Sequence, residues 1–128
     1  MAKVLLYNFT DEKRRRAVKA LLLRFAIPCR EVSPEAQAYS IGTLLERNDL
    51  PLPENQSEEI EPFSDEMLVM QALSPRQFNG LLDGMRQGGV WVPLKAVVTP
   101  HNIGWSSRRL YGELRMEQEA LRAGGGAR

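Results

Sequence analysis

The sequence predicts a single α/β domain with a four-stranded, mostly parallel sheet and helices on both faces. Short apolar segments, which are typical of buried strands, alternate along the 128 residues with longer segments whose apolar residues recur at helical spacing. Strands separated by helices favour right-handed crossovers and therefore parallel pairing. A chain of this length is sufficient for one domain with a substantial core. We expect the domain to span residues 1–122 and the strands to lie in the order 2-1-3-4.

The first half of the domain is expected to hold two strands and two helices. The apolar segment KVLLYNF, residues 3–9, is the first strand, and Thr10 is positioned to cap the helix that follows. Pro28 ends that helix, because proline lacks the backbone N–H that a helix interior requires. The segment CREVS, residues 29–33, is the second strand, and its final serine, followed by proline, begins a second helix.

The second half repeats this order of strands and helices. The apolar segment at residues 66–73 is the third strand, and Ser74 and Gln77 have the spacing of a capping box at the start of the next helix. A pair of glycines ends that helix. The fourth strand follows Pro93, and the last helix begins near residue 106 or 107. Residues 48–65, rich in proline and acidic residues, form an acidic loop between the halves, and residues 123–128 form a disordered tail.

Charge is unevenly distributed, although the whole chain carries only +1. Residues 1–30 contain eight basic and two acidic side chains, whereas residues 46–66 contain eight acidic side chains and one basic one. A near-neutral total argues against a dedicated nucleic-acid-binding protein, which is usually strongly basic. The asymmetry is explained either by internal ion pairing or by an acidic loop that shields a basic face.

The sequence indicates a cytoplasmic protein with no membrane segment. No apolar run approaches the roughly 20 residues that a transmembrane helix needs. The apolar stretch near the N-terminus is too short for a secretory signal. The single cysteine excludes an internal disulfide and a cysteine-based zinc cluster.

A ligand site, if present, is expected at the carboxyl ends of the strands, between strands 1 and 3, where the strand order reverses. The candidate ligand-binding residues that follow strands 1, 3 and 4 at that edge are Asn8, Thr10, Ser74, Thr99, His101, Asn102 and Trp105. His101 has the pKa range of a general acid or base. Alternatively, Thr99, His101 and Asn102 only hydrogen-bond the turn, and Trp105 packs beneath it.

No motif assigns a catalytic residue, a cofactor or a metal. The glycine-rich phosphate signatures G-x-G-x-x-G and G-x-x-x-x-G-K do not occur, and His101 has no metal-ligand spacing around it. Cys29 is interpreted as a partly buried apolar residue, although Arg30 beside it leaves a redox role open. Lys95, in the middle of a predicted strand, needs either an acidic partner or a path to the surface for its amine.

Two exposed features are candidate contact surfaces. The first is the basic run Lys13, Arg14, Arg15 and Arg16, which suits either a phosphate or RNA contact or a solvated helix face. The second is Trp91, which lies between two valines and is either part of the core or an aromatic residue at a subunit contact.

The second half of the chain resembles a bacterial family known only as domain of unknown function 3783. The similarity covers roughly residues 66–118, including the segment PLKAVVTPHNIGWSSRRLYGELRMEQ. The positions that match the family pattern are Lys95, Ala96, Thr99, Pro100, Asn102, Trp105, Leu110, Leu114 and Glu117. His101 lies where relatives are expected to have a small polar residue, which argues against an essential histidine. The family has no established activity, so the resemblance implies no mechanism.

Three hypotheses for function follow. The first is a non-catalytic interaction or regulatory module, such as a homodimer joined through an exposed sheet edge or through Trp91 and the last helix. The second is a small-molecule-binding protein or enzyme that uses the strand-end residues, with an unknown ligand. The third is weak nucleic-acid contact through the basic run of the first helix. The absence of a complete catalytic set favours the first.

Overall fold

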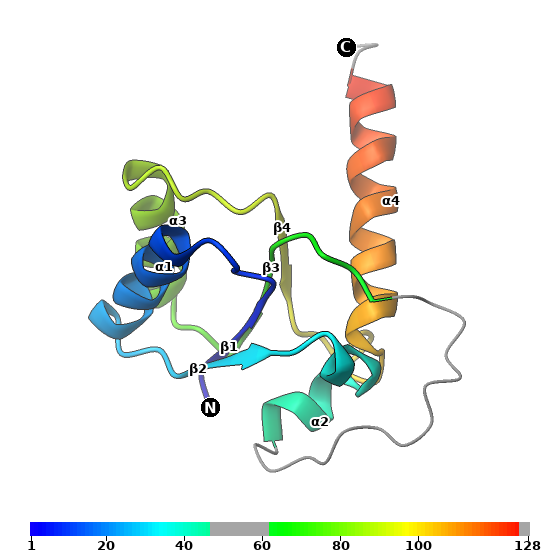
Figure 1. Cartoon of the computed structure of the whole chain (residues 1–128), viewed down its shortest axis with the longest axis horizontal. Helices are drawn as coiled ribbons and strands as arrows, with labels where there is room; N and C mark the ends of the chain where they lie inside the picture. Colours follow the sequence, from blue (N-terminus) through cyan, green and yellow to red (C-terminus); the bar gives the residue numbers. More distant parts are fainter. Residues whose placement is uncertain (47–61, 126–128) are drawn as a thin grey trace.

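The computed structural model describes residues 1–46 and 62–125, with side chains to residue 122. A four-stranded sheet lies between two layers of helices (Figure 1). The elements in chain order are β1 (Lys3–Tyr7), α1 (Glu12–Arg24), β2 (Cys29–Val32), the 3-10 helix η1 (Glu35–Ala38), α2 (Ile41–Glu46), β3 (Met67–Gln71), α3 (Pro75–Gln87), β4 (Leu94–Val97) and α4 (Ser107–Gly125).

The strand order β2-β1-β3-β4 and the mostly parallel pairing confirm the prediction, although one of the three strand pairs is antiparallel. The pairs β1–β2 and β3–β4 are parallel, whereas β1 and β3 are antiparallel, with Leu5 opposite Val69. Two strands joined by a single helix that packs on the sheet are expected to be parallel, and both pairs joined in this way are parallel. Between β2 and β3 the chain passes through η1, α2 and residues 47–61, so this expectation does not fix the direction of β3.

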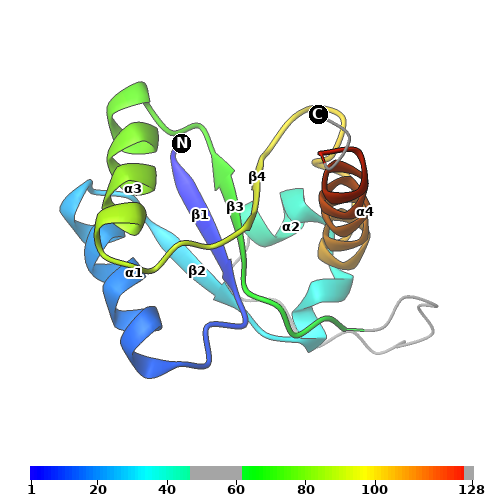
Figure 2. The same cartoon turned by 90° about the horizontal axis from the view of Figure 1, so that it is seen from above.

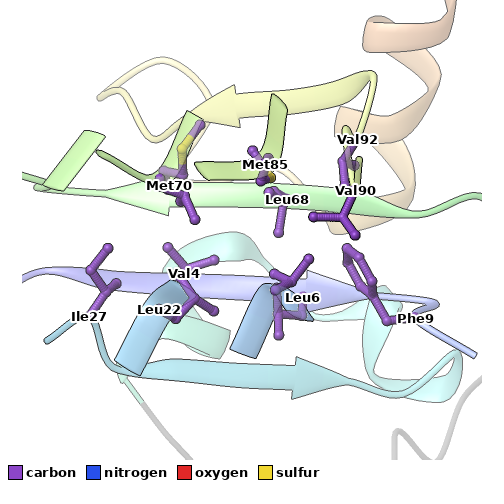
Figure 3. Close-up of a cluster of buried hydrophobic side chains, with 12 residues drawn as sticks. Val4, Leu6, Phe9, Leu22, Ile27, Leu68, Met70, Met85, Val90 and Val92 are labelled. Carbon is purple, nitrogen blue, oxygen red and sulfur yellow. The ribbon is translucent and has the colours of Figure 1, made fainter. Parts of the chain in front are cut away.

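Both faces of the sheet are covered. Helices α1 and α3 lie on one face, and η1, α2 and α4 lie on the other (Figure 2). Alternate residues of β1 and β3 therefore enter two different cores, which explains why both strands are continuously apolar. The core beneath α1 and α3 (Figure 3) contains Val4, Leu6, Phe9, Val18, Leu22, Ile27, Leu68, Met70, Leu81, Met85, Val90 and Val92.

The second core is centred on an aromatic group next to α4. The Phe63 ring stacks on the Tyr111 ring, with centroids 4.2 Å apart, and its centroid lies 5.6 Å from that of Tyr7. The Tyr7 hydroxyl lies 2.7 Å from the Ser107 hydroxyl in a buried hydrogen bond, and burial raises the pKa of Tyr7. This contact joins β1 to the start of α4.

The helix ends confirm one predicted cap and correct two other details. Ser74 and Gln77 form the predicted capping box. At α1 the cap is Asp11, one residue after the predicted Thr10, because the Asp11 carboxylate accepts the backbone N–H groups of two first-turn residues. The predicted helix after Ser33 is instead two short pieces, η1 and α2, because Tyr39 between them is extended.

Two predicted segments lie largely outside the described residues. Only residues 62–65 of the predicted acidic loop are described. The disordered tail was expected from residue 123, whereas α4 continues through Gly125, and residues 126–128 are outside the described part. In the part of the chain that the structure describes, no helix is long and apolar enough to cross a membrane.

Helices α1 and α3 approach closely at Gly80. A Cβ atom on Gly80 would lie 2.4 Å from the Phe25 ring, which is closer than real carbon contacts. Gly112 in α4, by contrast, has open space around its Cβ position. The first glycine is therefore required by packing, whereas the second only weakens its helix.

These two glycines predict opposite effects of the same substitution. We expect Gly80→Ala to lower the free energy of unfolding by about 1–3 kcal/mol, because the methyl group overpacks the contact with Phe25. We expect Gly112→Ala to raise it by up to about 1 kcal/mol, because alanine favours the helix. Urea unfolding followed by circular dichroism measures both. Stabilisation by Gly80→Ala would contradict the close α1–α3 packing.

Candidate functional site

The predicted strand-end residues do not converge on one site. Because β1 and β3 are antiparallel, the carboxyl end of β1 lies beside the start of β3, not beside its end. Asn8 and Thr10 therefore lie at one end of the strands, whereas Ser74, Thr99 and Asn102 lie at the opposite end. The expectation that these residues meet at one end of the sheet is wrong, since it depended on β1 and β3 running in the same direction.

Asn8 holds the chain that leads into β3. Its backbone is in the left-handed region, with φ of 62°, and its side-chain nitrogen donates to the carbonyls of Phe63 and Asp65, both at 2.9 Å. Asparagine tolerates this conformation better than most residues. Thr10, two residues later, is exposed. Asn8 thus fixes the direction from which β3 enters the sheet.

Asn102 and Thr99 form a closed turn after β4. The side-chain oxygen of Asn102, Oδ1, accepts a hydrogen bond from the backbone Thr99 N at 2.9 Å. In return, the Thr99 hydroxyl accepts one from the backbone Asn102 N at 3.1 Å. The Asn102 amide also donates to Val97 O at 3.1 Å. The predicted turn hydrogen bonds are therefore present for these two residues.

The Asn102 side chain also covers the last backbone groups on the outer side of β4. Val98 N donates to Met70 O of β3, so the alternating groups Val97 O and Thr99 N face away from β3. The Asn102 amide bonds both of them, as a neighbouring strand would. Its function in the described structure is to close the end of a sheet edge.

His101 and Trp105 form a surface aromatic contact in the same turn. Their ring centroids are 5.1 Å apart in an edge-on arrangement, and the Arg109 guanidinium lies 4.2 Å from the Trp105 centroid. Trp105 packs against the second core, as predicted, while His101 is exposed. Ser74, at the end of the neighbouring strand, has its hydroxyl engaged as a helix cap, with Gln77 N donating to it at 3.1 Å.

The basic run on α1 is largely engaged in binding that helix to the sheet. Arg14 makes a two-pronged contact with Glu66, at 2.7–3.1 Å, and also donates to Trp91 O at 3.0 Å. Arg15 makes an equivalent contact with Glu31 of β2 at 2.6 and 2.8 Å. Bidentate arginine–carboxylate pairs are stronger and more specific than single contacts. Internal ion pairing thus accounts for part of the uneven charge.

Lys13 and Arg16 are the outer members of the run. Arg16 lies 3.5 Å from Glu12 in an exposed pair on the same helix, and Lys13 donates its backbone N–H to the helix cap Asp11. The four cations therefore do not form one continuous open patch.

Trp91 supports two cations rather than belonging to the core. The residue is 36% exposed, with Lys95 Nζ 3.7 Å and the Arg86 guanidinium carbon 4.7 Å from the centroid of its ring. The Lys95 amine also donates to Val92 O. Burial, together with Arg86, lowers the pKa of Lys95. The amine is thus held by a ring and a backbone carbonyl, not by the acidic partners considered from the sequence.

One groove was not predicted from the sequence. It has a volume of about 490 Å³ between α1 and β2, and it is lined by Arg15, Arg16, Lys19, Ala20, Leu22, Leu23, Ile27 and Cys29. Burial raises the pKa of the Cys29 thiol, which favours the unreactive thiol form and fits the apolar interpretation. Among the described residues, no group of three or more His, Cys, Asp and Glu side chains is arranged to hold a metal ion.

The fold and these contacts define a three-layer α/β domain in which Asn8, Ser74 and Asn102 are engaged with the backbone of the chain. Residues 66–121 match the model of a family described as Domain of unknown function (DUF3783), which confirms the resemblance found in the sequence. The match covers β3, α3, β4 and α4 as far as residue 121. No curated protein and no solved structure matches the chain.

The Glu31 contacts predict a pH-dependent contribution to stability. Hydrogen bonds from Arg15, followed by those from Lys19, lower the pKa of Glu31 to about 2. Its stabilising effect is therefore present above the unfolded value near 4.5 and is lost as the pH falls toward 2. At pH 7 we expect Glu31→Gln to destabilise by at most about 1 kcal/mol, because the pair is partly exposed. Thermal unfolding across this pH range measures the effect, with Asp83→Asn as a surface control. A difference that persists unchanged at pH 2 would contradict it.

The turn after β4 predicts unequal effects of two neighbouring substitutions. We expect Asn102→Ala to destabilise by about 1–2 kcal/mol, because the two hydrogen bonds of the Asn102 side chain are lost and outward backbone groups are left uncovered. We expect His101→Ala to change stability by less than about 0.5 kcal/mol, since the ring is exposed. Urea unfolding compares them. A larger effect at His101 would reverse the assignment.

Proposed function

We propose that this protein is a non-catalytic interaction module that forms a homodimer through the outer edge of β4 and the adjoining face of α4. The observation that carries the proposal is the difference between the two edges of the sheet. A cytoplasmic location is part of the proposal, and the single cysteine supports it.

The β2 edge is protected by charge. Glu31 on β2 is paired with Arg15 and Lys19 of α1, so a charged network lies along this edge. Charged side chains on an edge strand oppose pairing with another chain. The β2 edge is therefore a poor surface for association.

The β4 edge lacks such protection over most of its length. Val97 is 50% exposed, and Ala96 beside it is small and half-buried. The charged residue of the strand, Lys95, has its amine directed to the Trp91 ring and to a backbone carbonyl. An exposed apolar edge is a template for another strand.

A second copy fits this edge in an antiparallel register. The backbone groups of Lys95 and Val97 alternate with those that face β3, so they point outward. A two-fold axis at Ala96 places Lys95 of one copy opposite Val97 of the other, which avoids opposing two lysines. Such a contact is closed, because the same surface is used by both copies. Asn102 covers the end of the strand and limits the pairing to this short region.

Helix α4 extends the same surface. It projects beyond the sheet (Figure 1), and Leu121 lies seven residues after Leu114, on the same side of the helix. Leu114 packs against the core, whereas Leu121 is 68% exposed. A hollow of about 290 Å³ lies between them and the start of β4 at Pro93 and Leu94. We propose that Leu121 of the second copy, near the end of its α4, fills this hollow.

The other two hypotheses have less support. A strand-end ligand site requires residues that the antiparallel β1–β3 pair separates. A nucleic-acid contact requires free cations, whereas Arg14 and Arg15 each hold a carboxylate in a bidentate pair.

The homodimer predicts specific effects on assembly. We expect light scattering to show a dimer whose dissociation constant rises at least about tenfold in both Val97→Lys and Leu121→Glu, because each places a charge in the contact. Leu23→Glu is the matched control, since Leu23 is 82% exposed on α1, on the far side of the sheet. It should leave the dissociation constant unchanged. A monomer at every concentration, or equal disruption by Leu23→Glu, would reject the proposed surface.

A further inference from the structure

We infer that the chain consists of two copies of one β-α-β-α unit. The contact between strands β1 and β3 is then the interface through which one copy of this unit binds another. The kind of partner that each half fits is thus a second copy of the same unit. This inference is independent of the proposed homodimer, which uses the outer edge at β4.

The first three elements of the two halves correspond in order and length, whereas the last helical part is η1 and α2 in one half and the longer α4 in the other. Strands β1 and β3 each have five residues, helices α1 and α3 each have thirteen, and strands β2 and β4 each have four. In each half the first two strands are parallel and the helix between them covers the same face of the sheet.

The unusual backbone conformations also correspond. In the described residues, four positions have positive φ, and they form two matching pairs. Asn8 directly follows β1 and Ala72 directly follows β3, with φ of 62° and 54°. Ala26 and Gly89 each follow the C-cap residue of α1 or α3, with φ of 54° and 69°. Positive φ is uncommon outside glycine, so the match is not expected from two unrelated segments.

The segments after β2 and β4 share sequence and hydrogen bonds. Residues 33–40 read SPEAQAYS and residues 99–106 read TPHNIGWS, with Ser/Thr-Pro, an aromatic residue and Ser in the same places. The first hydroxyl accepts from the backbone three residues later in both: Ala36 N donates to Ser33 Oγ, and Asn102 N donates to Thr99 Oγ1.

The last serine of each segment caps the following helix in the same way. Ser40 Oγ accepts from Thr43 N, and Ser106 Oγ accepts from Arg109 N. The serine carbonyls likewise accept the fourth following N–H of α2 and α4. These bonds continue the correspondence into the helices on the second face.

Equivalent residues meet each other at two places, as a two-fold axis requires. In the centre of the sheet, Leu5 of β1 pairs with Val69 of β3, which is the third residue of its strand as Leu5 is. On the second face, the equivalent serines Ser40 and Ser106 form an antiparallel bridge. Contacts between a residue and its own equivalent are the signature of an isologous interface.

The family match supports this division, because residues 66–121 correspond to one unit. In a single unit, β3 would pair with β4 alone and its other edge would be unpaired. In the whole chain β3 also pairs with β1, and its residues from Met67 to Met70 are buried. The first half supplies the missing strand. The structure therefore contains, within one chain, the interface that two such units form.

A graft in the full-length chain tests the equivalence. Residues 99–106 are replaced by SPEAQAYS, through the six changes Thr99→Ser, His101→Glu, Asn102→Ala, Ile103→Gln, Gly104→Ala and Trp105→Tyr. The Gly104 position has open space, so the added methyl group is accommodated. Identical segments then face each other across the axis. We expect a cooperative unfolding transition with Tm within about 5 °C of the Asn102→Ala variant, which accounts for the lost turn bonds.

The control carries the same eight residues in reversed order, which displaces the proline and the aromatic residue while keeping the composition and the serine at each end. We expect it to lose at least about 10 °C more than the graft. Equal losses would overturn the inference. A second variant exchanges only the aromatic residues, Tyr39→Trp with Trp105→Tyr, and should also retain Tm within about 5 °C. A loss as large as that of Trp105→Ala would overturn the equivalence even if the graft did not fold.

Discussion

The antiparallel pairing of β1 with β3 is the contact on which the rest of the structure depends. Both strands are buried on both faces, so they supply apolar residues to both cores at once. Each of the two βαβ units contributes one strand to this central pair. Asn8 binds the segment that leads into β3, and the Tyr7–Ser107 hydrogen bond joins β1 to the start of α4. Reversing β3 would displace α3 and α4 as well as the strand, since both follow it in the chain.

This pairing also determines what the polar residues do. It separates the strand ends that the sequence suggested as one site, and three of the candidate residues stabilise local backbone: Asn8 before β3, Ser74 at α3 and Asn102 beside β4. The arginines of α1 have a similar role, because their bidentate contacts hold the helix to the sheet. These contacts stabilise the fold, and the proposed function therefore rests on the outer surfaces instead.

The predicted features were those that depend on nearby residues. The capping box at Ser74 needs only Gln77, and parallel β1–β2 and β3–β4 pairs follow from single helical crossovers. The direction of β3 depends on a long connection and on an asparagine that reaches Phe63, so no local pattern specified it. The Arg14–Glu66 pair joins residues 52 positions apart for the same reason. The repeat, by contrast, was visible: aligning residues 33–40 with residues 99–106 shows its Pro, aromatic and Ser positions.

The two halves differ at the outer edges of the sheet and in the length of their last helices. Near the axis the equivalent serines and central strands are retained, because a change on one side must fit its counterpart on the other. At the outer edges no such constraint acts: β2 carries a charged network, whereas β4 carries Val97 and the Asn102 closure. A duplicated unit thus yields two different edges from one fold. The edge without charge is the one that remains suited to bind a further chain.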